Sequence, residues 1–104
     1  MKSLYAVYDR VSDHWNDVIS CGNDAEAVRG FVHSCSNLSI PENFLKDIAI
    51  YRIGVFDECT GVICDADQKL IMVGDDYNII SNRDYILKKM RGFTDEVSEK
   101  ESDT

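Results

Sequence analysis

The chain has 104 residues and a net charge of −8, from 19 acidic and 11 basic side chains. This length suits one domain with a modest core, and because the chain has no run of about 18 apolar residues, we expect no membrane span. The excess of acids argues against nucleic-acid binding by charge alone, because that mode needs Lys and Arg to displace counterions.

The N-terminal part begins with two strand patterns. Residues 4–10 alternate in polarity, with Leu4, Ala6 and Tyr8 on one face. Residues 15–21 are predicted to return as a second strand after a polar turn. The start of the chain has no long apolar segment of the signal-peptide type, so we expect the protein in a cytoplasm.

The next segment, residues 23–36, predicts the main helix. Asn23 can cap the first turn, and Glu26 stands at the capping-box position. An apolar stripe follows at helical spacing: Ala25, Val28, Phe31, Val32 and Cys35. Arg29 lies away from this stripe, either as a solvated partner of Glu26 or as a binding residue.

The middle of the chain predicts a short helical turn and then the strongest strand. Pro41 suits the first turn of a helical segment over residues 41–46. Residues 48–58 are largely apolar on both faces, which is typical of a central strand or of one covered by another subunit. We therefore expect a homodimer. Gly54 interrupts the pattern and suggests a bulge or a close backbone approach.

The remaining elements complete a small α+β domain with an antiparallel sheet of four to five strands. Short strands are predicted at 62–65 and 69–73, separated by a turn, and a C-terminal helix at about 82–91, capped near Ser81 and ended by Gly92. Residues 1–92 form the domain, and the acidic residues 93–104 are expected to be a disordered tail. That tail either aids solubility or mimics nucleic acid.

No catalytic or metal signature stands out. Four cysteines occur without Cys-x-x-Cys or Cys/His spacing: Cys21, Cys35, Cys59 and Cys64. In a cytoplasmic protein they are expected to be reduced thiols, and no metal or cofactor is expected. The acidic pair Asp75-Asp76 has no nucleophile or ligand spacing around it, so we do not expect an enzyme.

Four blocks, in order, resemble one family. They are Tyr5-Ala6-Val7-Tyr8-Asp9, the helix start Asn23 to Phe31, Pro41-Glu42-Asn43-Phe44, and Ile53 to Asp57 with Thr60-Gly61. Together they are similar to the small nonstructural protein of gokushoviruses, single-stranded DNA bacteriophages of the Microviridae. The resemblance covers residues 4 to about 74 and leaves the last helix and the tail outside. It implies a protein of the host bacterial cytoplasm that binds DNA or switches viral synthesis from duplex to single strands for packaging.

The first hypothesis is therefore a single-stranded DNA-binding regulator. Such proteins combine basic residues with aromatic faces for stacking. Candidate residues are Tyr8, Arg29, Tyr51, Arg52, Lys88, Lys89 and Arg91. Arg52 shares a strand face with Ile50, so an aromatic and basic sheet surface is conceivable, and the densest basic cluster lies at the end of the last helix.

The second hypothesis is a protein-interaction adaptor. The net charge of −8 suits an acidic surface that attracts a basic partner by long-range electrostatics. The partner would be a phage or host replication protein, or the procapsid, with no contact to DNA or membrane.

Overall fold

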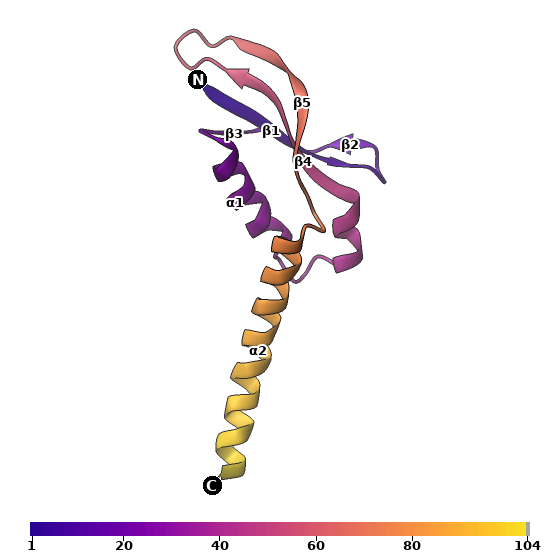
Figure 1. Ribbon diagram of the computed structural model, residues 1–104, viewed down its shortest axis with the longest axis vertical. Coiled ribbons are helices and arrows are strands. Elements are labelled where there is room, and N and C mark those ends of the chain that lie inside the picture. Colours follow the sequence, from indigo (N-terminus) through magenta and orange to yellow (C-terminus); the bar gives the residue numbers. More distant parts are fainter. Residues whose placement is uncertain (104) are drawn as a thin grey trace.

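The computed structural model describes residues 1–103, with side chains for residues 1–91. A five-stranded antiparallel sheet carries one helix on one face, and a second helix projects from its lower end (Figure 1). The elements in chain order are β1 (Lys2–Asp9), β2 (His14–Trp15), β3 (Ile19–Cys21), α1 (Asp24–Cys35), the 3-10 helix η1 (Glu42–Asp47), β4 (Ile48–Phe56), β5 (Ile63–Val73) and α2 (Tyr77–Asp103). The predicted α+β class and antiparallel sheet are confirmed.

The strand order places β4 inside the sheet. The path is β2-β1-β4-β5, and β3 also pairs with β1. The predicted strand at 15–21 is thus divided into two pieces, because β2 pairs with Tyr8 and Asp9 whereas β3 pairs with the start of β1. Since β4 lies between β1 and β5, its two apolar faces are those of a central strand.

One strand prediction is wrong. The residues expected to form two strands with a turn at Asp67-Gln68 form the single strand β5. This strand follows β4 through two register shifts, one of them between Arg52 and Gly54. This second shift accommodates the extra residues around Asp67-Gln68, and β5 continues to pair with β4 on both sides of it. A Cβ on Gly54 would lie 2.9 Å from the Cys64 carbonyl oxygen, so both features expected of this glycine are present.

Helix α1 begins where the sequence predicts. The Asn23 side chain accepts a hydrogen bond from the Glu26 amide at 2.9 Å. The Glu26 carboxylate reaches back to the Gly22 amide at 3.0 Å, one residue before the cap. The buried stripe is rotated from the predicted one: Ala27, Phe31 and Cys35 are buried, whereas Ala25 is exposed.

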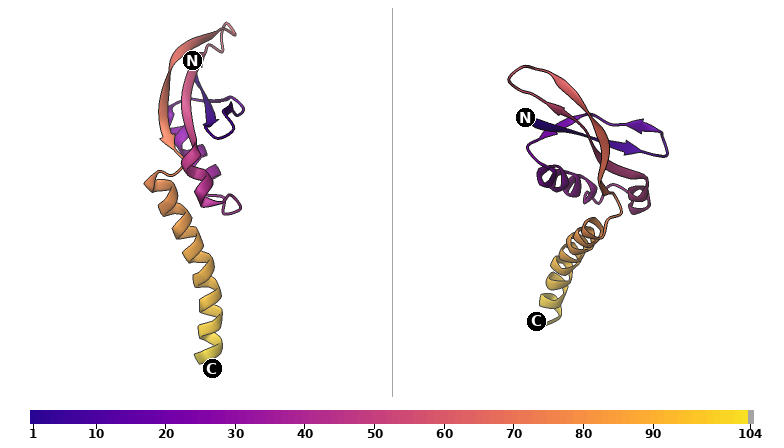
Figure 2. Two further views of the ribbon diagram at one scale, coloured as in Figure 1. Left: turned by 90° about the vertical axis from the view of Figure 1, so that its right-hand side faces the viewer. Right: turned by 45° about the horizontal axis from the view of Figure 1, so that its top comes forward.

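The core lies between the sheet and the helices. Tyr5 and Ile50 contribute from the strands, Phe31 from α1, Leu45 from η1 and Ile79 from α2. Helix α1, η1 and the first turn of α2 therefore lie on the same side of the sheet, whereas the rest of α2 extends away from it (Figure 2). Within the described residues, no helix covers the other face.

The last helix differs from its prediction at both ends. Helix α2 starts at Tyr77, earlier than predicted, and the residue that caps it is Asp76 and not Ser81. The Asp76 carboxylate accepts a hydrogen bond from the Asn78 amide at 2.9 Å. It continues past Gly92 to Asp103. The prediction of a disordered tail falls on residues whose side chains lie outside the described part, and the division at residue 92 stays a prediction.

Candidate functional site

The uncovered face of the sheet carries three aromatic rings from three strands. Tyr8 of β1 lies opposite Trp15 of β2, and their ring centroids are 4.9 Å apart. Trp15 in turn meets Tyr51 of β4 edge to face, with centroids 5.4 Å apart. We call these residues the aromatic row, and the face that bears them the open face.

The residues around the aromatic row are small or apolar. Ala6 lies opposite Tyr51 and is 1% exposed, so a small buried residue lies beside the large rings. Leu70 of β5 pairs with Tyr51 from the other side and is 50% exposed. Trp15 itself is 42% exposed. The open face is therefore an accessible, mainly apolar surface that spans β2, β1, β4 and β5.

A tight turn between β1 and β2 holds Trp15 in place. The Asp9 carboxylate accepts the amides of Val11 and Ser12 at 2.9 and 3.4 Å. Asp13 takes a left-handed conformation with φ of 54°, and the Tyr8 hydroxyl donates to its carboxylate. That hydrogen bond is the main cause of a raised pKa for the Tyr8 hydroxyl.

The covered face holds a separate polar cluster at the start of α1. The Tyr5 hydroxyl donates to the Asp24 carboxylate, which also lies 3.8 Å from Arg52 Nη1 and 3.7 Å from Lys69 Nζ. The Tyr5 hydrogen bond, helped by both cations, lowers the pKa of Asp24. The pKa of Tyr5 is raised, mainly by burial. Arg52 is therefore engaged within the fold.

The seven predicted site residues do not converge on one surface. Tyr8 and Tyr51 share the open face, but Arg52 lies on the opposite face, because neighbouring residues of a strand alternate. The expected sheet surface therefore contains the two predicted tyrosines but not Arg52. Arg29 is exposed on α1, and the basic cluster is exposed on α2: Lys88, Lys89 and Arg91.

Two residues that the structure makes prominent, Trp15 and Arg83, are not among the seven predicted site residues. Trp15 was on a predicted strand, but its place between Tyr8 and Tyr51 depends on the turn geometry and on the pairing of β1 with β4. Arg83, predicted at the start of the last helix, is 7% exposed and donates to backbone carbonyls near the end of α1. These hydrogen bonds depend on the packing of α2 against the end of α1, which the sequence pattern does not indicate.

The cysteines and acids form no metal centre within the described residues. All four cysteines are free thiols, and only Cys35 is buried. Burial raises its pKa to about 11. An apolar cavity of about 390 Å³ lies between α1 and the sheet, lined in part by Ile19, Phe31 and Ile40.

The comparisons with known proteins place the chain in a family. The family described as Phage ORF5 protein matches residues 2–77. The chain belongs to this family. The match contains all five strands, α1 and the aromatic row of this Phage ORF5 family protein, and it ends at the first residue of α2. Neither the curated proteins nor the solved structures gave a match. Among the described residues, no helix has the length and apolar character to cross a membrane.

Proposed function

We propose that this phage protein binds single-stranded DNA through the open face of its sheet. The observation that carries the proposal is the aromatic row, in which the Trp15 ring lies 4.9 Å from Tyr8 and 5.4 Å from Tyr51 on a face that no described helix covers. Unpaired bases stack on such rings without regard to sequence, and each stacked base contributes about 1–3 kcal/mol.

The role that we propose for this binding is supported by the phage family and by the resemblance to gokushovirus nonstructural proteins. In the host bacterial cytoplasm, the protein would coat newly displaced single strands and so favour single-strand synthesis and packaging over duplex replication. The protein would thus regulate DNA synthesis by occupying the single strand and not by catalysing a reaction.

The charge distribution sets how the binding should respond to salt. The net charge is −8, and the Tyr8 hydroxyl is bonded to a carboxylate. Stacking would therefore supply most of the affinity, and few counterions would be released. We expect the logarithm of the affinity to fall with the logarithm of salt concentration at a slope shallower than about −1.

Titration with oligo(dT) tests the proposal directly. Trp15 is the single tryptophan of the chain, so its fluorescence should be quenched when a base stacks on it. With a labelled short oligonucleotide, Trp15→Leu and Tyr51→Leu should each weaken binding about tenfold. Tyr85→Leu is the matched control, since Tyr85 is exposed on α2 away from the open face.

Two results would contradict this site. One is the absence of quenching and of binding at low salt. The other is binding that Lys88/Lys89/Arg91→Ala removes while Trp15→Leu leaves it intact, which would move the interface to α2.

A second candidate function is the adaptor that binds a phage or host replication protein or the procapsid. The observation that favours it is the separation of the aromatic row from the predicted cation Arg52, since an exposed apolar patch also suits a protein partner. A nuclease-treated pull-down from infected cells, compared between wild type and Trp15→Leu, distinguishes the two functions. A partner that survives nuclease and is lost with Trp15→Leu supports the adaptor, and recovery of nucleic acid alone rejects it.

A further inference from the structure

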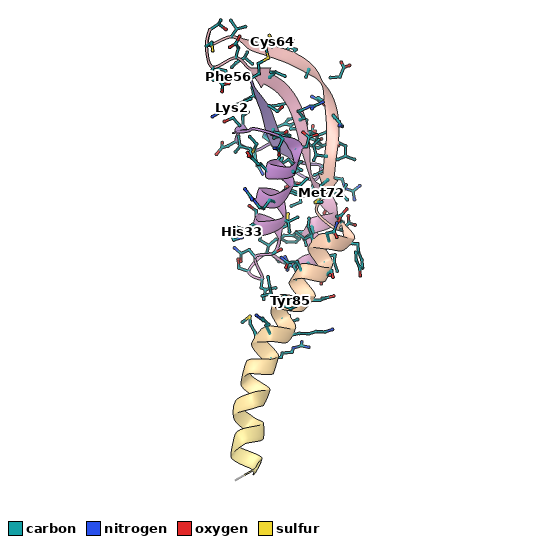
Figure 3. All side chains as sticks on the ribbon, turned by 60° about the vertical axis from the view of Figure 1, so that its left-hand side comes forward. Lys2, His33, Phe56, Cys64, Met72 and Tyr85 are labelled. Carbon is teal, nitrogen blue, oxygen red and sulfur yellow. The ribbon has the colours of Figure 1, made fainter. Side chains whose placement is uncertain are left out.

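Two neighbouring cavities form an apolar groove on the side of the sheet that carries α1. The cavity of about 390 Å³ between α1 and the sheet is here called the α1 cavity. A second cavity of about 340 Å³, the η1 cavity, lies beside η1 and the end of β1. Ile40 and Ile48 line both, so the two cavities adjoin. Figure 3 shows α1, with the labelled His33, below the end of the sheet that bears Lys2 and Phe56, and the groove lies toward the other end.

The rim of this groove carries exposed apolar side chains. Val11 is 75% exposed, Phe44 56% and Ile19 45%, and each of them lines one of the two cavities. Single exposed apolar residues are ordinary on a protein surface, but several that adjoin cavities are typical of a surface that receives side chains of another molecule. The groove therefore has the shape and the polarity of a binding site for apolar side chains.

Gly30 keeps the α1 cavity open on its helical side. This residue lines the cavity, and a Cβ at its position would meet nothing within 4 Å. A glycine inside a helix is less favourable than an alanine, because it loses more conformational freedom on folding. The space beside Gly30 is therefore not explained by the stability of α1, and an occupant of the cavity would explain it.

The charges around the groove are acidic. Asp17 lines the α1 cavity, and Asp9 and Asp47 line the η1 cavity. Arg10 Nε donates to the Asp47 carboxylate at 2.7 Å, whereas the Asp9 carboxylate accepts the backbone amide of Val11 and keeps its charge. Among the described residues that line either cavity, none is a Lys or an Arg.

These charges determine which occupant suits the groove. Two copies of the chain joined groove to groove would bring acids against acids, and a DNA strand would bring phosphates against acids. A partner with basic side chains would instead be attracted to Asp17 and Asp9. The occupant that fits both the polarity and the charge therefore combines apolar and basic residues.

We propose that this groove binds a basic peptide segment of another protein, with one apolar side chain of the segment in each cavity. Lysine or arginine side chains of the segment lie beside Asp17 and Asp9, and its apolar side chains contact Ile40, Ile48 and Phe44. The groove is on the side of the sheet opposite the aromatic row. The proposal therefore does not depend on DNA binding, and both surfaces can be occupied together.

Three labelled synthetic peptides test the chemistry of the occupant. The first is Lys-Lys-Leu-Lys-Lys-Phe-Lys-Lys, which carries two apolar side chains among basic ones. The second replaces its Leu and Phe by Ser, and the third replaces its Lys residues by Glu. In fluorescence anisotropy, the first should bind the wild-type chain at least about tenfold more tightly than either of the others.

Substitutions in the groove test its location with matched controls. Gly30→Leu should fill the α1 cavity and weaken binding of the first peptide about tenfold, whereas Gly30→Ala adds one carbon and should weaken it by less than about threefold. Asp17→Asn should weaken binding about threefold. Asp84→Asn changes the net charge equally on α2 and should leave binding within about 1.5-fold of wild type. An unfolding midpoint of Gly30→Leu at or above that of wild type shows that the variant is folded.

Several results would overturn the proposal. The first peptide may be bound no more tightly than its Ser-substituted form, which would mean attraction by charge alone. Equal effects of Asp17→Asn and Asp84→Asn would remove the acidic rim from the site. A wild-type dimer that Gly30→Leu dissociates, with no peptide bound, would assign the groove to a second copy. Oligo(dT) binding that Gly30→Leu weakens and Trp15→Leu leaves intact would assign it to DNA, whereas peptide binding that Trp15→Leu leaves unchanged supports two separate surfaces.

Discussion

At the scale of single residues, Arg83 connects the two helices. Its Nη1 donates to the carbonyls of Cys35 at 2.7 Å and Asn37 at 3.2 Å, and its Nη2 donates to Ile40 at 2.6 Å. These are carbonyls at and beyond the C-terminus of α1, where a cation also suits the helix dipole. The planar guanidinium can reach all three, whereas the single ammonium group of Lys cannot.

We therefore predict that replacement of Arg83 destabilises the protein strongly. Arg83→Met should lower the free energy of unfolding by about 3 kcal/mol because buried carbonyls lose their donor, and Arg83→Lys by about 2 kcal/mol. Urea unfolding measures both changes. Arg29→Met, an exposed change on α1, should stay within about 0.5 kcal/mol of wild type. Equal effects at both positions would contradict the role of Arg83.

The cysteines give a second residue-scale prediction. Cys59 and Cys64 are exposed, whereas Cys35 is 2% exposed and its pKa is raised to about 11. Thiolates are the reactive form, so at pH 8 Cys59 and Cys64 should react rapidly with a thiol reagent and Cys35 only after unfolding. Mass spectrometry of labelled peptides distinguishes the sites. Rapid labelling of Cys35 in the folded protein would contradict its burial.

The raised pKa of Cys35 also sets a direction for stability against pH. The folded value of about 11 lies above the ordinary value of 9.0, so in this range the folded thiol holds a proton that the unfolded one releases. The contribution is present in full below pH 9.0 and is lost as pH rises toward 11. The fall should be smaller in Cys35→Ala, compared by urea unfolding across this range.

At the scale of elements, two glycines should respond to alanine in opposite directions. Gly30 lies inside α1, and a Cβ there would meet nothing within 4 Å. Gly74 follows β5, and a Cβ there would lie 2.2 Å from the Leu45 carbonyl oxygen. Gly30→Ala should raise the free energy of unfolding by about 0.5–1 kcal/mol, and Gly74→Ala should lower it. Thermal unfolding of both variants provides the comparison, and a stabilised Gly74→Ala would show that η1 can move away.

The same elements show what the sequence could predict. The start of α1 could be predicted from the sequence, because Asn23 and Glu26 form their capping hydrogen bonds within one helical turn. The single strand β5 was wrongly predicted as two strands, because its pairing with β4 outweighs the turn propensity of Asp67-Gln68. Asp76 and Ser81 are both good caps, and the docking of Ile79 in the core favours the earlier one. At the candidate site Tyr8 and Tyr51 were predicted, but their contact through Trp15 depends on strand register, which no local pattern specifies.

At the scale of the whole molecule, the sheet domain and helix α2 differ in their relation to the family. The family match ends at residue 77, where α2 begins, so the open face belongs to the matched part and nearly all of α2 to the remainder. The proposed DNA interface therefore lies entirely within the part of the chain that the family shares.

The place of the proposed interface should make DNA binding insensitive to charge changes on the last helix. We predict that Glu96→Lys and Asp95→Lys each bind a short oligonucleotide within about twofold of wild type, because the aromatic row lies in the part of the chain that the family matches and both substitutions lie beyond it. Fluorescence anisotropy measures the three affinities. If both variants bind much more tightly than wild type, charge on α2 contributes to binding, and if the wild-type chain does not bind the oligonucleotide, the DNA function fails.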